Sequence, residues 1–195
     1  MAELQSPIGS AYVTGDHGNA AGGVGVTIRE RIGLSIIQIT AWSDTIPEVL
    51  TAIGSATGLV LQNKPGLGRV AGEKSVFGFA PGRYFVVAAT PELELRLRSV
   101  ISADLATIID LTHGRTVIRV SGPDAEWVLS KLFAIDFSEH AFPIAYGRAT
   151  LHHDIHANIQ HIDDETFDLY VFRTFARSFW KTLGHAAEEV GYKVE

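Results

Sequence analysis

The same order of strands and helices occurs twice along this chain of 195 residues, and that repetition restricts the possible folds more than any other feature. A predicted strand at 35–40 and helix at 44–57 recur as a strand at 116–121 and a helix at 124–133. The later strands and the closing helix of each half keep nearly the same spacing. Each half therefore reads β-α-β-β-α after a leading strand, the order of a split βαβ unit. We predict an α+β fold of two tandem split-βαβ (ferredoxin-like) repeats with pseudo-two-fold symmetry.

The repetition also sets the predicted domain boundaries. Residues 1–23 are rich in Gly, Ala and Ser, and such a segment cannot bury enough apolar surface to order itself. We predict a flexible Gly-rich arm over 1–23 and a single domain over 24–195. That domain consists of two repeats, 24–104 and 105–195.

Local patterns give the elements of the second repeat most clearly. Gly122 and Pro123 predict a turn from strand to helix, since Gly allows an unusual φ and Pro suits a first helical turn. The helix that follows is amphipathic, and its apolar stripe is Ala125, Val128, Leu129, Leu132 and Phe133. Further predictions are a helix over 91–103 and a strand-rich segment over 148–162.

Composition excludes several classes of partner and compartment. The net charge is −6, and no run of Lys and Arg could follow a phosphate backbone, so nucleic acid and anionic membranes are excluded as partners. Zero cysteines exclude disulfides, thiolate nucleophiles and Cys-based metal sites. The longest uncharged stretch, 49–63, is too short to span a bilayer, and the N-terminus has no signal-peptide pattern. The expected location is the cytoplasm.

Four of the eight histidines fall within 152–161, which makes this segment the one candidate for a metal site. On a continuous strand, His152, Asp154 and His156 share one face. Two imidazoles and a carboxylate could bind zinc or non-haem iron, with His140 or His161 as a further ligand.

A subunit contact needs the same kind of residues as that metal site. Imidazole can both pack and form hydrogen bonds, so His152, His153, His156 and His161 are equally candidates for an interface. A long exposed strand also invites pairing, so the isolated chain could self-associate. We favour the interface and assign no metal site.

The sequence contains no identifiable catalytic or cofactor-binding motif. No nucleophile and base occur in a recognisable arrangement, and Gly23-x-Gly25 lacks the third glycine of a dinucleotide-binding fingerprint. The basic, Gly-rich loop 63–69 contains Pro65, which removes a backbone donor that a phosphate cradle would use. We therefore predict no catalytic residue and no cofactor on this chain.

Three segments carry a family resemblance: Asp110–Ala125, Phe133–Phe137 and Thr166–Trp180. They resemble the gamma subunit of heterotetrameric sarcosine oxidase and, more distantly, the first domain of the glycine-cleavage aminomethyltransferase and its folate-binding relatives. The resemblance implies a subunit whose partners are the alpha, beta and delta subunits. It also implies that FAD, FMN, NAD and tetrahydrofolate are held by those partners, where sarcosine is oxidised to glycine with formation of hydrogen peroxide and methylene-tetrahydrofolate.

Two functions therefore stand as alternatives. The first is a non-catalytic structural subunit of a sarcosine oxidase complex. The second is a free-standing folate- or pterin-binding module of the aminomethyltransferase-like class. The folate-binding relatives carry a Gly-Gly hairpin where this chain has residues 149–161 without any glycine, so their folate motif is not transferred.

Overall fold

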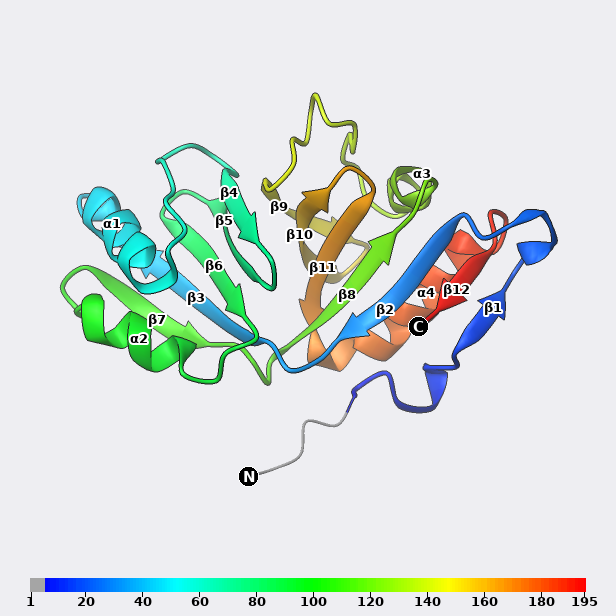
Figure 1. The fold of residues 1–195 in the computed structure, drawn as a ribbon, viewed down its shortest axis with the longest axis horizontal. Helices are drawn as coiled ribbons and strands as arrows, with labels where there is room; N and C mark the ends of the chain where they lie inside the picture. Colours follow the sequence, from blue (N-terminus) through cyan, green and yellow to red (C-terminus); the bar gives the residue numbers. More distant parts are fainter. Residues whose placement is uncertain (1–5) are drawn as a thin grey trace. The chain divides into compact units, whose positions relative to one another are not determined.

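A computed structural model describes residues 6–195, which form two β-sheets with α-helices packed against them (Figure 1). This confirms the predicted α+β class. The chain divides into two compact units. The five-stranded unit comprises residues 33–113 and 145–148, and the seven-stranded unit comprises the described residues up to 32 together with 114–144 and 149–195.

The five-stranded unit is an antiparallel sheet with two helices against one face (Figure 1). Its strands lie in the order β4-β5-β6-β3-β7. The elements are β3 (Ser35–Ala41), α1 (Ile46–Thr57), β4 (Gly68–Ala71), β5 (Lys74–Ala80), β6 (Arg83–Ala88), α2 (Leu93–Val100) and β7 (Ala106–Asp110). The helices and the sheet share an apolar core in which Ile39, Ile53 and Leu97 are fully buried.

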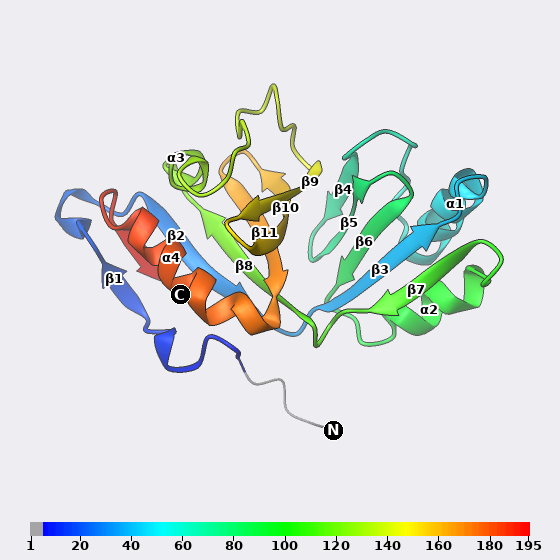
Figure 2. The ribbon, with the colours of Figure 1, turned by 180° about the vertical axis from the view of Figure 1, so that it is seen from behind.

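The seven-stranded unit has the strand order β1-β12-β2-β8-β11-β10-β9 (Figure 2). The elements are β1 (Gly15–His17), β2 (Val26–Arg31), β8 (Arg115–Ser121), α3 (Ala125–Ser130), β9 (Gly147–His152), β10 (Ile155–Asp163), β11 (Thr166–Phe172), α4 (Ala176–Ala187) and β12 (Tyr192–Val194). Strand β12 runs parallel to β2, whereas β2, β8, β11 and β10 are antiparallel to their neighbours in that series. Val120, Leu169 and Phe179 are fully buried members of its interior.

The two sheets share part of their strand order. The series β4-β5-β6-β3 in one sheet corresponds to β9-β10-β11-β8 in the other, and in each case a helix follows the first and the last strand in chain order. The leading strands, however, are exchanged: β2 precedes β3 in the chain but pairs with β8, and β7 precedes β8 but pairs with β3. The boundaries of the compact units therefore differ from those of the predicted repeats 24–104 and 105–195, because β2 belongs to the seven-stranded sheet and β7 to the five-stranded sheet.

The turn between β8 and α3 forms as predicted from its glycine. Gly122 has φ +123°, and a Cβ at this position would lie 2.6 Å from the carbonyl oxygen of Gly25. Both the backbone conformation and the close approach of another strand require glycine here. Along α3, Val128 and Leu129 are fully buried, as the apolar stripe predicted.

Three predicted elements differ from the structure. The helix expected over 124–133 is confined to Ala125–Ser130, so Leu132 and Phe133 of its apolar stripe lie in the turn that follows. The helix expected over 91–103 is confined to Leu93–Val100. The strand-rich segment over 148–162 is two strands, β9 and β10, with a two-residue turn at His153 and Asp154.

The described part of the Gly-rich arm contacts the rest of its unit, in contrast to the flexible arm predicted over 1–23. Ile8 is fully buried beside a short 3-10 helix, η1 (Gly9–Ala11). The Tyr12 ring stacks on Trp180 with centroids 5.1 Å apart, and β1 pairs with β12. Two other 3-10 helices are η2 (Ala20–Gly22) and η3 (Arg173–Phe175). Residues 1–5 of the predicted arm lie outside the described residues.

Across residues 6–195, no helix combines the length and the apolar character that crossing a membrane requires.

Candidate docking surfaces

The histidine segment forms a hairpin, and this changes the expected metal geometry. Because the turn at His153 and Asp154 interrupts the strand, His152, Asp154 and His156 do not alternate along one strand, and that premise of the metal site is wrong. His153 has φ +49°, a conformation that His adopts more readily than most residues. Among residues 6–195, no group of three or more His, Asp or Glu side chains is placed to hold a metal ion.

The members of this segment are used in different ways. His152 is half-buried, its Nδ1 lies 2.8 Å from the carbonyl oxygen of Leu132, and its ring packs edge-on against Phe133. His153, Asp154 and His156 are exposed. Three of the four proposed interface histidines are therefore at least partly accessible.

His161 belongs to the interior rather than to an interface, which corrects its assignment. Its side chain is fully buried, and its ring stacks on Phe167 with centroids 4.4 Å apart. Its Nδ1 lies 2.6 Å from the carbonyl oxygen of Phe142. His140, the other proposed further ligand, is exposed.

The Gly-rich loop 63–69 and β4 pack closely against residues 145–147, which belong to the same unit. The Gly147 amide donates to the carbonyl oxygen of Gly66 at 2.7 Å. A Cβ on Gly68 would lie 2.0 Å from the Ala145 carbonyl oxygen, and one on Gly147 would lie 2.0 Å from a ring carbon of Phe77. These glycines are needed for backbone packing, which accounts for the loop without a ligand.

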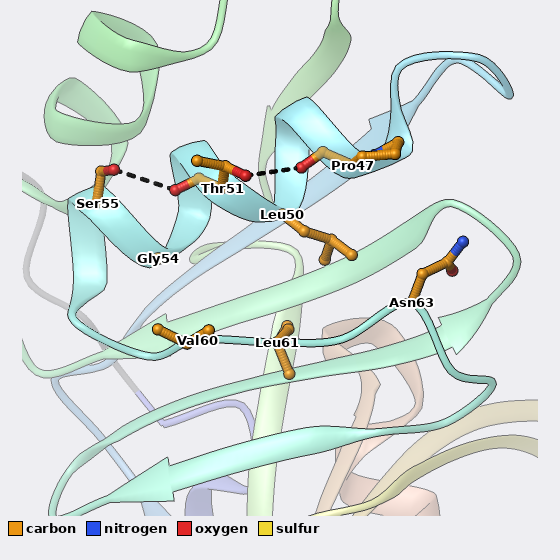
Figure 3. Close-up of a pocket in the computed structure, with 8 residues that line it drawn as sticks. All are labelled: Pro47, Leu50, Thr51, Gly54, Ser55, Val60, Leu61 and Asn63. Atoms are coloured by element: carbon orange, nitrogen blue, oxygen red, sulfur yellow. Dashed lines mark hydrogen bonds between the residues drawn. The ribbon is translucent and has the colours of Figure 1, made fainter.

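A groove runs between α1 and the chain that follows it (Figure 3). It has a volume of about 530 Å³, and its lining residues are Pro47, Leu50, Thr51, Gly54, Ser55, Val60, Leu61 and Asn63. The hydroxyl of Thr51 donates to the carbonyl oxygen of Pro47 at 2.9 Å (Figure 3). The hydroxyl of Ser55 donates to the carbonyl oxygen of Thr51 at 3.1 Å. Because both hydroxyl donors are used within the helix, the groove is largely apolar, and no charged side chain lines it.

A buried carboxylate joins three strands of the seven-stranded sheet. Asp168 on β11 is fully buried, and its two oxygens accept from Nε and Nη2 of Arg119 on β8 at 2.7 and 2.8 Å. Arg31 on β2 donates to Asp168 from Nη1 at 2.7 Å. The arginine side chains are 15% and 8% exposed, so this is a buried ion-pair cluster. We expect it to fix the alignment of the three strands.

A second cluster holds an exposed tryptophan on α3. Trp127 is 56% exposed, and its Nε1 donates to Oε1 of Glu189 at 2.6 Å. Lys131 forms an ion pair with the same oxygen at 2.6 Å, donates to the carbonyl oxygen of Ala186 at 2.9 Å, and lies 5.4 Å from the indole centroid. Hydrogen bonds from Lys131 and Trp127 lower the pKa of Glu189. The indole is thus fixed in place while much of it remains exposed.

Sequence reasoning did not identify either cluster. The partners of Asp168 are remote in the sequence, so no local pattern could reveal them. Trp127, in contrast, lies outside the apolar stripe of its helix, and aromatic residues are enriched at protein interfaces, so its position is a local signal that sequence reading could have used.

Comparison with solved structures defines the fold class. The chain is similar to a chain of the heterotetrameric sarcosine oxidase from Corynebacterium sp. U-96 in complex with pyrrole 2-carboxylate, with a TM-score of 0.79, 20% identity, and 95% of each chain covered. It is also similar to the glycine cleavage system aminomethyltransferase T from Bartonella henselae, with a TM-score of 0.64 and 15% identity. That match covers 88% of this chain but 48% of the aminomethyltransferase. The fold is the one these two proteins share.

The family follows from the sequence. The model of the sarcosine oxidase, gamma subunit family matches residues 43–189, and the chain belongs to this family. This confirms the resemblance stated from the three sequence segments. No curated protein matches the chain.

Proposed function

We propose that this chain is a non-catalytic structural subunit of a cytoplasmic heterotetrameric sarcosine oxidase complex. The family match over residues 43–189 carries the proposal, and the structural similarity over 95% of both chains supports it. The partners would be the alpha, beta and delta subunits. Flavins, NAD and tetrahydrofolate would be bound by those partners, with none on this chain.

In this proposal the chemistry takes place on the large subunits. Sarcosine, oxygen and tetrahydrofolate would give glycine, hydrogen peroxide and methylene-tetrahydrofolate. The contribution of this chain is to stabilise and position the subunits through its exposed surfaces. The hairpin histidines His152, His153 and His156 are candidates for one such contact, because at least part of each ring is accessible.

We also propose that the two sheets derive from one split-βαβ repeat. The shared order β4-β5-β6-β3 and β9-β10-β11-β8 supports this, as does the equivalent placement of the helices in the chain. The exchange of β2 and β7 would then join the two copies.

Co-expression tests the proposed function. The chain should co-purify in a fixed ratio with the three other subunits, and omitting it should reduce the yield or thermal stability of the assembled oxidase. The isolated chain should be colourless and should produce no peroxide from sarcosine. A flavin absorbance band or sarcosine-dependent peroxide from the chain alone would overturn the proposal, as would a complex that assembles equally well without it. Stoichiometric binding of a reduced folate by the isolated chain would instead support the folate-binding alternative.

A further inference from the structure

A second groove lies beside Trp127 in the seven-stranded unit. It has a volume of about 400 Å³ and is open to solvent. Its lining residues are Pro123, Glu126, Trp127, Ser130, Ile135, Asp136, Phe137 and Ser138. A groove of this size can accommodate one or two side chains of a bound segment rather than a folded domain.

The apolar part of this groove is already in a fixed conformation. The hydrogen bond from Trp127 to Glu189 and the position of Lys131 over the indole hold the ring, so little side-chain entropy remains to be lost when a partner binds. Tryptophan is one of the residue types enriched among the few side chains that dominate the energetics of protein interfaces. The indole is therefore suited to act as the centre of a contact.

The charged part of the groove is negative. Glu126 and Asp136 line it, and the backbone amide of Ser138 donates to Oδ1 of Asp136 at 3.0 Å. Hydrogen bonds from Ser138 lower the pKa of Asp136, which favours its carboxylate form. The nearby cation Lys131 is neutralised by its ion pair with Glu189. The described residues of the seven-stranded unit carry 14 acidic and nine basic side chains, so this unit as a whole is negatively charged.

Charge and shape together select the occupant. An arginine side chain has a planar cation that stacks on aromatic rings and forms paired hydrogen bonds with carboxylates. Aliphatic neighbours of that arginine would contact Pro123 and Ile135. An acidic or purely apolar segment would leave Glu126 and Asp136 desolvated without a partner, which is unfavourable.

We propose that this groove binds a basic, arginine-containing segment of another subunit of the complex, with a guanidinium placed between Trp127 and the carboxylates of Glu126 and Asp136. The inference rests on the proposed function and specifies one of its contacts. A second copy of this chain, or an acidic partner, is the alternative occupant.

The test uses the full chain in two binding assays. The first measures its affinity for the co-expressed remaining subunits at low and physiological ionic strength. The second uses fluorescence anisotropy of a short amidated peptide of alternating arginine and leucine, with its glutamate–leucine counterpart as the control peptide.

The test variant is Glu126→Gln/Asp136→Asn, which removes two charges and keeps the side-chain shapes. The matched control is Asp164→Asn/Glu165→Gln, which removes the same charges from an exposed turn.

The double variant should weaken subunit binding about tenfold or more and should reduce its salt dependence, because desolvated charge pairs at an interface are lost. The control variant should bind as the parent does. The arginine peptide should bind the parent and the control but not the double variant, and Trp127→Ala should also weaken binding of this peptide.

If the complex assembles with unchanged affinity for the double variant, the groove proposal is wrong while the proposed function stands. If no subunit binds, the proposed function fails, and the peptide assay then tests separately whether the groove prefers a basic segment. Equal binding of both peptides, or binding of neither, rejects a basic occupant.

Discussion

Asp168 provides the most direct test of the structure, because one buried carboxylate holds two arginines. Replacing it in Asp168→Asn keeps the shape of the side chain but removes its charge. The amide can still offer one oxygen, whereas its NH2 group would face a guanidinium. Arg31 and Arg119 would then be left largely buried with no counter-charge from residue 168.

The expected loss in the free energy of unfolding is about 3–5 kcal/mol, the usual cost of removing one partner from a buried ion pair. Three charge-assisted hydrogen bonds of 2.7–2.8 Å are lost or weakened, and each typically contributes about 1.5–3 kcal/mol. The total should fall below that sum, because both arginine side chains are slightly exposed and can regain some water.

Urea unfolding followed by tryptophan fluorescence measures this loss. The protein has three tryptophans, and Trp127 and Trp180 lie in the seven-stranded unit while Trp42 lies in the other. In a Trp42→Phe background the signal therefore reports the unit that contains Asp168. The matched control is Glu195→Gln, which removes the exposed partner of Lys193. The control should not change the unfolding midpoint, since exposed ion pairs contribute little.

A loss below about 1 kcal/mol for Asp168→Asn would refute the reasoning. It would mean that the arginines find other partners or water, and that the cluster does not fix the alignment of the three strands.

Three further predictions concern packing and pH. Leu129→Ala should cost about 2–5 kcal/mol of unfolding free energy, because the side chain is fully buried, and an unchanged melting temperature would contradict this. Gly147→Ala should destabilise the five-stranded unit, because the added Cβ would clash with the ring of Phe77. Gly54→Ala within α1 meets only ordinary contacts at 3.8 Å and should raise the free energy of unfolding by about 0.4–1 kcal/mol. Thermal melts of the two variants should therefore shift in opposite directions. The hydrogen bond from Trp127 to the Glu189 carboxylate should persist at a pH above the pKa of Glu189 and should be lost as the pH falls through that pKa. The midpoint of this loss should lie below the ordinary glutamate pKa of about 4.3. The fluorescence difference between the parent and Trp127→Phe across acidic pH measures that midpoint, and a midpoint above the ordinary value would contradict the prediction.

Local signals in the sequence were sufficient for part of the fold. The apolar stripe around Leu129 and the turn at Gly122 are short-range features, and both appear in the structure as predicted. The turn at His153 and Asp154 contains one turn-favouring residue, Asp154, and no glycine or proline, so the alternating pattern around it reads as one continuous strand.

Long-range pairing could not be predicted in the same way. Which strand pairs with β2 depends on register and packing between distant segments, and β2 has no local feature that selects β8. The same limit applies to the candidate site. The polar partners of Trp127 and Asp168 come from other elements, so the sequence could indicate an unusual residue on a helix face but not the cluster that fixes it.

The exchange of leading strands has a consequence for synthesis of the chain. Strand β2 leaves the ribosome long before its partner β8 and must remain unpaired meanwhile, although domains generally fold from the N-terminus as they emerge. Its charged residues Arg29, Glu30 and Arg31 discourage pairing with other chains during this interval. The five-stranded unit must also wait, since β7 and then Tyr146, which packs against its core, come from the second half. The five-stranded sheet is therefore complete only after β7, which ends at Asp110, and the seven-stranded sheet only after β12 at the end of the chain.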